Sequence, residues 1–338
     1  MSQSTVGDYE LGELLGSGTV GNAYRAKHRE SGQPAVIKFL QTYAAAEPDI
    51  QRRFVREVSI TEKLDHPNIV RHFDCGLDAD RIYFAMELVD CGTLKDVLRQ
   101  RGKLPWREAV ECAMQICAAL EHAHQLGVFH RDLKPANLFL AGNGQVKVGD
   151  FGLARDLNSS RLTVDGQTVG TCRYMPPEQI AGEANLTGAV DLYAVGCILY
   201  EMLLGQTPFD GGTIVEIFEA HLNDEPVPPA ELIDCPADLS ELVMRLLAKS
   251  PRDRATSAAA VQSALADILH ERPMRLEVRS PEELAADLAA TIHPDRPNLT
   301  VRLHSDSEGE HKSWTPAMLV LGLVAAAIVI LIVVSSLR

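Results

Sequence analysis

The chain has 338 residues, with 46 acidic side chains against 32 lysines and arginines and a formal net charge of −14. Because no basic stripe offsets this charge, the chain is not expected to bind nucleic acid, whose phosphates attract clustered lysine and arginine. Its seven cysteines are odd in number and lack the spacing of a metal site, which favours reduced thiols in a cytoplasmic compartment.

Residues 1–8 form a polar leader without the basic start and apolar core of a signal peptide. A glycine-rich stretch then separates two strand-like runs, Tyr9–Leu14 and Ala23–His28. Its residues are Leu15, Gly16, Ser17, Gly18, Thr19, Val20, Gly21, Asn22 and Ala23. Glycines there would let a hairpin turn bring backbone N–H groups against phosphate, which a Cβ would obstruct. A plain hairpin is the simpler alternative, and a dinucleotide-binding turn would need a helix where the second strand follows.

The next elements are an apolar strand that ends at Lys38 and a predicted helix from about Ile50 to Leu64. Beyond residue 100, apolar residues recur at helical spacing. The predicted helices are Leu104–Gln125, Asp191–Leu204, Ile214–Asn223, Leu239–Ala248 and Ser257–His270, with a turn-rich stretch at Asp224–Pro236. Strands therefore precede a mainly helical part.

Functional side chains are densest at His130–Asn137 and at Asp150-Phe151-Gly152. Asp132 is a candidate proton acceptor beside an attacking hydroxyl, and Lys134 is a candidate cation beside the γ-phosphate of ATP. Asn137 and Asp150 offer oxygen ligands for Mg²⁺, with Mn²⁺ as an alternative metal. The spacing is the one that phosphoryl transfer from ATP requires.

This run resembles the catalytic loop and metal-binding segment of the eukaryotic-type, or Hanks-type, serine/threonine protein kinase family. The resemblance covers residues 9–270 and implies an α+β, bilobal protein-kinase fold. A small antiparallel β-sheet lobe with one helix would precede a larger, mainly helical lobe. It also implies an enzyme that transfers the γ-phosphate of ATP to serine or threonine of protein substrates, since Lys134 and Thr171 match the serine/threonine branch.

The resemblance also implies a nucleotide site between the lobes. The glycine-rich stretch would cover the phosphates, and Lys38 would hold two of them while pairing with Glu57. Glu62 is a competitor for that pairing, but it lies later than the family pattern places the glutamate.

The adenine pocket is implied in the same way. Ala23 and Val36 would form its roof. The family usually has valine at the first position and alanine at the second, so the total side-chain volume of the pair is unchanged. Phe139 would form part of the floor. The implied gatekeeper and hinge are Met86, Glu87 and Leu88.

The segment Gly170–Glu178 resembles the substrate-docking end of the activation segment, with Pro176 where the family usually has alanine. The resemblance makes Arg254 the partner of Glu178, and Asp191 part of the helix that anchors the catalytic loop. Arg131 suggests control by phosphorylation of the activation segment. The candidate acceptors are Thr163 and Thr168, with Ser159 and Ser160 behind them.

Residues 271–315 contain few aromatic residues, several prolines and an acidic end, and are predicted to be a juxtamembrane linker. One amphipathic helix is predicted at Pro281–Ile292, with Ser280 as its N-cap. The remainder is predicted to be a largely disordered tether.

The run Ala317–Val334 is uncharged. As a helix it would be about 27 Å long, close to the hydrocarbon thickness of about 30 Å. Residues 316–334 are therefore predicted to form a transmembrane helix, with 335–338 as a short tail. The predicted location is the inner cell membrane, with the kinase domain on the cytoplasmic side, as in the bacterial transmembrane serine/threonine kinases that the arrangement resembles.

The predicted partners are protein substrates, membrane lipid around the C-terminal helix, and a transient homodimer for phosphorylation in trans. Three alternatives stay open. They are a membrane-tethered pseudokinase or adaptor scaffold, a small-molecule phosphotransferase, and an active kinase whose residues 271–315 mainly recruit a partner.

Overall fold

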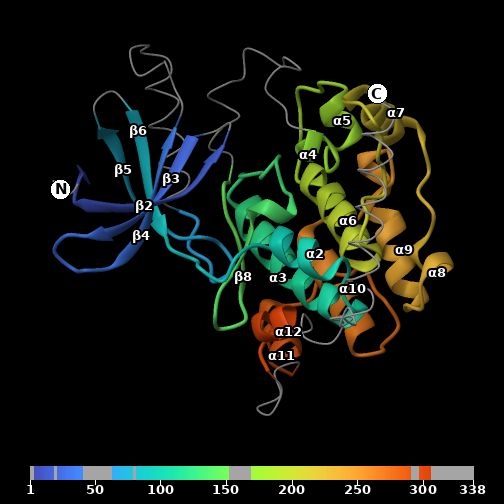
Figure 1. Cartoon of the computed structure of the whole chain (residues 1–338). Coiled ribbons are helices and arrows are strands. Elements are labelled where there is room, and N and C mark those ends of the chain that lie inside the picture. Colours follow the sequence, from blue (N-terminus) through green and yellow to red (C-terminus); the bar gives the residue numbers. More distant parts are fainter. Residues whose placement is uncertain are drawn as a thin grey trace, which may run out of the picture. The chain divides into compact units, whose positions relative to one another are not determined.

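The computed structural model describes residues 4–18, 21–40, 63–78, 81–151, 169–290 and 297–305. Nearly all of them belong to the first of two compact units, Met1–Leu303. This unit combines an antiparallel sheet with a helical part (Figure 1), which confirms the predicted α+β fold. Several predicted features lie outside the described residues: Thr19, Val20, Glu57, Glu62, most of the helix at 50–64, the candidate phosphorylation sites and the apolar run at 317–334.

The N-terminal sheet has the strand order β1-β2-β3-β4-β6-β5, and every neighbouring pair is antiparallel. The strands are β1 (Thr5–Val6), β2 (Tyr9–Gly18), β3 (Gly21–His28), β4 (Pro34–Leu40), β5 (His72–Asp78) and β6 (Arg81–Glu87). Side chains alternate between the two faces of a strand. Ala35, Ile37 and Phe39 of β4 therefore pack into one apolar cluster, whereas Val36 contacts a second cluster that includes Met86 and Phe139.

The helical part is built around one large apolar core. Its helices are α2 (Leu94–Arg101), α3 (Trp106–Gln125), α4 (Val169–Cys172), α5 (Pro177–Ile180), α6 (Ala189–Leu204), α7 (Ile214–Asn223), α8 (Pro229–Leu232), α9 (Ala237–Leu246) and α10 (Ala258–Leu269). Short 3₁₀ turns are η1 (Pro135–Asn137) and η3 (Pro251–Asp253), and a small hairpin is formed by β7 (Leu138–Leu140) and β8 (Val146–Val148). The central helices α3 and α6 are buried along most of their length, which explains their largely apolar sequences.

The five helices predicted in this part are confirmed, with ends that differ by two residues at most. Helix α3 begins at Trp106 because Pro105, in an extended conformation, occupies the N-cap. Helix α8 falls within the stretch Asp224–Pro236 that was predicted to be rich in turns, and Pro229 at its first position fits a helix start.

Two helices follow α10. Helix α11 (Pro281–Ala290) confirms the helix predicted at Pro281–Ile292 and its cap. The Glu283 N–H donates to Ser280 Oγ at 3.2 Å, and Ser280 N–H donates to the Glu283 carboxylate at 3.0 Å. Such reciprocal bonds satisfy backbone donors that a helix start otherwise leaves open.

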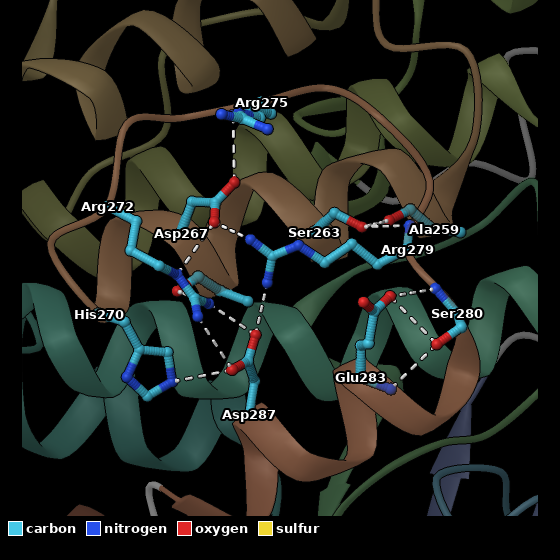
Figure 2. Close-up of polar contacts among 11 residues, drawn as sticks. Ala259, Ser263, Asp267, His270, Arg272, Arg275, Arg279, Ser280, Glu283 and Asp287 are labelled. Atoms are coloured by element: carbon cyan, nitrogen blue, oxygen red, sulfur yellow. Dashed lines mark hydrogen bonds and ion pairs between the residues drawn. The ribbon is translucent and has the colours of Figure 1, made fainter.

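Arginine–carboxylate contacts fasten α11 to α10. Asp267 of α10 and Asp287 of α11 lie between Arg272 and Arg279, as Figure 2 shows. Both guanidinium groups approach an Asp287 oxygen at 2.6 Å. Leu284 of α11 is buried against the same core as α10.

Helix α12 (Leu299–Ser305) was not predicted, and the prediction of a disordered tether is wrong for residues 297–303. Leu299 and Leu303 are 5% and 0% exposed and belong to the large core. They lie four residues apart and so share one face of the helix. The stretch is too short for a helical period to be visible in the sequence.

Within the described residues, no helix has the length and apolar character needed to cross a membrane.

Candidate active site

The catalytic loop brings four predicted residues together. Lys134 Nζ lies 2.9 Å from Asp132 Oδ2 and donates to Thr171 Oγ1 at 2.9 Å. Asn137 Nδ2 donates to the Asp132 carbonyl, also at 2.9 Å. The acid, the cation and the docking-segment threonine therefore form one connected group.

Asp191 of α6 holds the backbone of this loop. Its carboxylate, 1% exposed, accepts hydrogen bonds from the N–H groups of His130 and Arg131, both at 2.8 Å. His124 contacts the same carboxylate at 2.8 Å. Burial raises the pKa of Asp191, but the His124 hydrogen bond and the other donors outweigh it and leave the pKa below its ordinary value. Arg131 has φ 62°, an uncommon conformation for a side-chain-bearing residue, and these bonds stabilise it.

His130 links the loop to the segment that carries Asp150. Its Nδ1 accepts from the Asp132 N–H at 3.3 Å, so Nε2 carries the proton and donates to the Gly149 carbonyl at 2.9 Å. The imidazole also lies 4.9 Å from the ring of Phe151, centroid to centroid. Because His130 is 1% exposed, it acts as a buried connector rather than as a group that reaches substrate.

The strand lysine meets the predicted metal ligand. Lys38 Nζ lies 2.6 Å from Asp150 Oδ1, and this pair joins β4 to the segment after β8. Burial raises the pKa of Asp150, but the ammonium of Lys38 outweighs burial and keeps the pKa below its ordinary value. Since Glu57 lies outside the described residues, the Lys38–Glu57 pairing stays a prediction.

The glycine-rich stretch is a hairpin. Gly16 pairs with Ala23, Ser17 with Asn22 and Gly18 with Gly21, so strand continues into strand. A Cβ on Gly16 would meet no atom within 4 Å, which leaves open space beside this backbone. This topology is the kinase version of the motif rather than the dinucleotide-binding version.

The proposed adenine walls converge from separate elements. Val36 of β4, Met86 of β6 and Phe139 of β7 contact one apolar cluster. Ala23 lies opposite Lys38 in the β3–β4 register. In the implied hinge, the Glu87 N–H already donates to the Arg71 carbonyl at 2.8 Å.

The comparisons with known proteins agree with this geometry. Residues 9–266 match the family model of the protein kinase domain. The chain belongs to this family. It is 35% identical over 272 residues to the serine/threonine-protein kinase PknB of Mycobacterium leprae, a match that covers 78% of this chain and 43% of that protein. It is 37% identical over 264 residues to PknB of Mycolicibacterium smegmatis, covering 76% and 42%.

A third relative is a probable serine/threonine-protein kinase, CPE1738, of Clostridium perfringens, which is 33% identical over 276 residues, 81% of this chain and 40% of that protein. The chain thus spans less than half the length of these curated relatives. The resemblance inferred from the motifs is confirmed. As a protein kinase domain, the chain belongs with enzymes that use ATP and a divalent metal.

The docking segment of this kinase domain is fixed by a buried ion pair. Arg254 donates to both Glu178 oxygens, at 2.7 and 2.9 Å, and the two side chains are 0% and 4% exposed. The two residues predicted as scaffold partners therefore meet.

Two polar contacts near the site were not predicted. Gln179 Nε2 donates to the Arg131 carbonyl at 3.2 Å and so joins the docking segment to the residue before Asp132. Lys147 Nζ lies 3.0 Å from Glu87 Oε2, between β8 and the end of β6. Neither residue carries a sequence signal, because a lone glutamine or lysine reads as an ordinary surface side chain.

The donor set fits a magnesium–nucleotide complex. Asn137 and Asp150 provide an amide oxygen and a carboxylate, which are the hard oxygen ligands that Mg²⁺ takes. The Asn137 amide is already oriented by its bond to the Asp132 carbonyl. Lys38, which contacts Asp150, and Lys134, which contacts Asp132, supply positive charge near these ligands, as phosphate binding requires.

Proposed function

We propose that this chain is a serine/threonine protein kinase that uses ATP and Mg²⁺, or Mn²⁺ in its place. The observation that carries the proposal is the contact of Lys134 with both Asp132 and Thr171. This contact brings an acid and a cation of the catalytic loop next to a hydroxyl of the docking segment. Asp191 accepts hydrogen bonds from the backbone of that loop. The glycine hairpin and the Lys38–Asp150 pair support a nucleotide phosphate site.

In this proposal Asp132 orients the substrate hydroxyl and accepts its proton, and Lys134 stabilises the negative charge that develops on the transferring group. Lys38 binds nucleotide phosphates, and Asn137 and Asp150 are the metal ligands. The bound nucleotide supplies the phosphoryl group and its metal neutralises charge. The chain itself contributes position and electrostatics rather than a covalent intermediate.

Membrane anchoring and control by phosphorylation are further parts of the proposal. The uncharged run Ala317–Val334 supports a single membrane-spanning helix. The proposed use of ATP favours the cytoplasmic side for the kinase domain. Tethering would raise the effective concentration of neighbouring copies and favour phosphorylation in trans. The proposed acceptors are Thr163 and Thr168, with Arg131 as the cation that receives the phosphate.

The test compares wild-type full-length protein with Asp132→Asn in liposomes that contain ATP and Mg²⁺. Loss of the proton acceptor is expected to lower transfer by roughly 10²- to 10⁴-fold. Mass spectrometry would locate the phosphate. The matched control is Asp234→Asn, which changes an exposed aspartate outside the catalytic loop. ATP binding without any transfer by the wild type would favour the scaffold alternative.

A further inference from the structure

Helix α12 is seated on the turn of the β7–β8 hairpin. Thr300 Oγ1 donates to the Ala141 carbonyl at 2.7 Å, and Asn298 Nδ2 donates to the Gly142 carbonyl at 2.9 Å. The fit is close, because a Cβ on Gly144 would lie 2.9 Å from the Asn298 Cβ. Two side chains of the segment 297–303 thus bind backbone groups of one short turn.

A group of buried charges fixes the other side of α12. Arg302 contacts Glu111 and, at 3.7 Å, Glu108, both on α3. Arg101 lies 3.0 Å from Glu108 and donates to the Arg302 carbonyl at 3.3 Å. The four side chains are at most 13% exposed. Among the described residues, two carboxylates meet two guanidinium groups here, so removal of Arg302 would take a buried counter-charge away from Glu111.

Helix α3 also contacts the β7–β8 hairpin, through Gln115. Gln115, one turn beyond Glu111, donates to the Gly144 carbonyl at 3.3 Å and accepts from the Val146 N–H at 2.9 Å. The hairpin turn is therefore held by α3 on its inner side and by residues 297–303 on its outer side.

The strands of this hairpin lead to the proposed metal ligands. Strand β7 begins directly after Asn137, and β8 ends two residues before Asp150. In addition, the Gly149 N–H donates to the Asn137 carbonyl at 2.9 Å, which closes the hairpin at that end. A displacement of the turn is thus transmitted along two short, paired strands to both ligands.

From these contacts we infer that residues 297–303 are a positioning element for the metal-ligating hairpin. The element lies beyond residue 266, where the match to the family model ends. It acts through Ala141, Gly142 and α3, and touches neither nucleotide nor substrate. The inference rests on the proposed function only in taking Asn137 and Asp150 as metal ligands.

The test uses full-length protein with Arg302→Glu, which places a third negative charge beside Glu108 and Glu111. Undocking should speed amide hydrogen exchange at residues 297–303 and then at 138–148 in the nucleotide-free protein. It should also weaken Mg²⁺-dependent binding of a non-hydrolysable ATP analogue by roughly 2- to 30-fold. Binding of the same analogue without Mg²⁺ should weaken less, because it depends on the hairpin only through Phe139 of β7 and not through the metal ligands.

Val301→Glu is the matched control, since Val301 is 49% exposed on the same helix. Adding Glu111→Arg to Arg302→Glu should restore the opposite charges, slow exchange at 138–148 again and recover metal-dependent binding. Leu303→Asp, which places a charge in the core, is a second route to undocking.

Three outcomes would overturn the inference. One is fast exchange at 297–303 with unchanged exchange at 138–148. Another is a loosened hairpin with unchanged Mg²⁺-dependent binding. The third is that neither Arg302→Glu nor Leu303→Asp loosens α12. A wild-type protein that binds the metal–nucleotide pair as described but transfers no phosphate would contradict the proposed function and leave the positioning role intact.

Discussion

The Glu178–Arg254 pair shows how much a single residue can matter far from the chemistry. Both side chains are almost fully buried, and Arg254 also donates to the carbonyls of Ala248, Ala189 and Lys249. One arginine therefore ties the docking segment to α6 and to the loop before η3. Its role is to hold geometry, and its loss would leave a carboxylate without a counter-charge.

Arg254→Met is expected to lower the free energy of unfolding by about 3–5 kcal/mol, because Glu178 would remain buried and uncompensated. Urea denaturation measures the change. The control is Arg99→Ala, which breaks an exposed pair with Asp96, 78% and 47% exposed, and should cost less than about 1 kcal/mol. If the two variants lost equal free energy of unfolding, burial would not be what makes the Arg254–Glu178 pair stabilising.

At the residue scale, the sequence predicted most of the catalytic loop because its chemistry is encoded in a few adjacent positions. Asp132, Lys134 and Asn137 lie within one short run, so their contacts are local. The contact of Lys38 with Asp150 was not predicted, since the two residues are far apart in the chain and the sequence pointed to Glu57 instead. Distant pairings depend on tertiary packing, which no local pattern contains.

At the scale of elements, the packing of α6 on α9 depends on one glycine. A Cβ on Gly196 would lie 2.8 Å from the Leu246 Cβ and 3.3 Å from its carbonyl carbon. Backbone cannot move aside as the end of a flexible side chain can. The two helices therefore approach more closely here than any larger residue would allow.

Gly196→Ala is expected to destabilise the protein even though alanine is the better helix former by about 1 kcal/mol. Overpacking in a filled core costs about 1–3 kcal/mol, so the free energy of unfolding should fall by up to about 2 kcal/mol after the gain in helix propensity is subtracted. Thermal unfolding would measure it. At Gly212 an added Cβ would meet only the end of the Glu216 side chain at 3.4 Å, so Gly212→Ala should change stability little. A stabilised Gly196→Ala protein would refute the close-packing argument.

Long elements were predictable and short ones were not. Helices α3, α6, α9 and α10 contain enough turns for their apolar spacing to repeat. Helix α11 was found through its Ser280 cap and its acidic first turn. Helix α12 has a cap, since Asn298 Oδ1 accepts from the Val301 N–H at 3.0 Å, but it has no acidic first turn. The carboxylates of Glu108 and Glu111, which contact it, are typical of an ordinary solvated helix face.

For the molecule as a whole, buried and half-buried histidines and carboxylates predict a loss of stability in acid. Burial is the largest cause that lowers the pKa of His66 and His72 to about 4, and of His221 to about 3, from 6.5. The unfolded chain therefore takes up these protons at a higher pH than the folded protein. Stability is complete above pH 6.5 and is lost as the pH falls toward about 4. Asp150 and Asp191, whose pKa values are also lowered, add to the loss in the same direction at lower pH.

Each histidine contributes a slope of at most about 1.4 kcal/mol per pH unit within this window. Urea unfolding of the full-length protein between pH 7.5 and pH 5 should therefore show a free energy of unfolding that is level down to about pH 6.5 and then falls. A value that stayed constant over this range would contradict the lowered pKa values.

The packing of α12 against the core also determines where a truncated fragment of this protein can end. The family match ends at residue 266, whereas the compact unit extends to Leu303. A fragment that stops at the earlier residue would retain every described candidate for catalysis, yet it would uncover the apolar surface beneath Leu284, Leu299 and Leu303. Uncovered apolar surface invites aggregation. The family match and the compact unit thus end at different residues. A fragment for crystallisation or inhibitor screening should extend to Leu303.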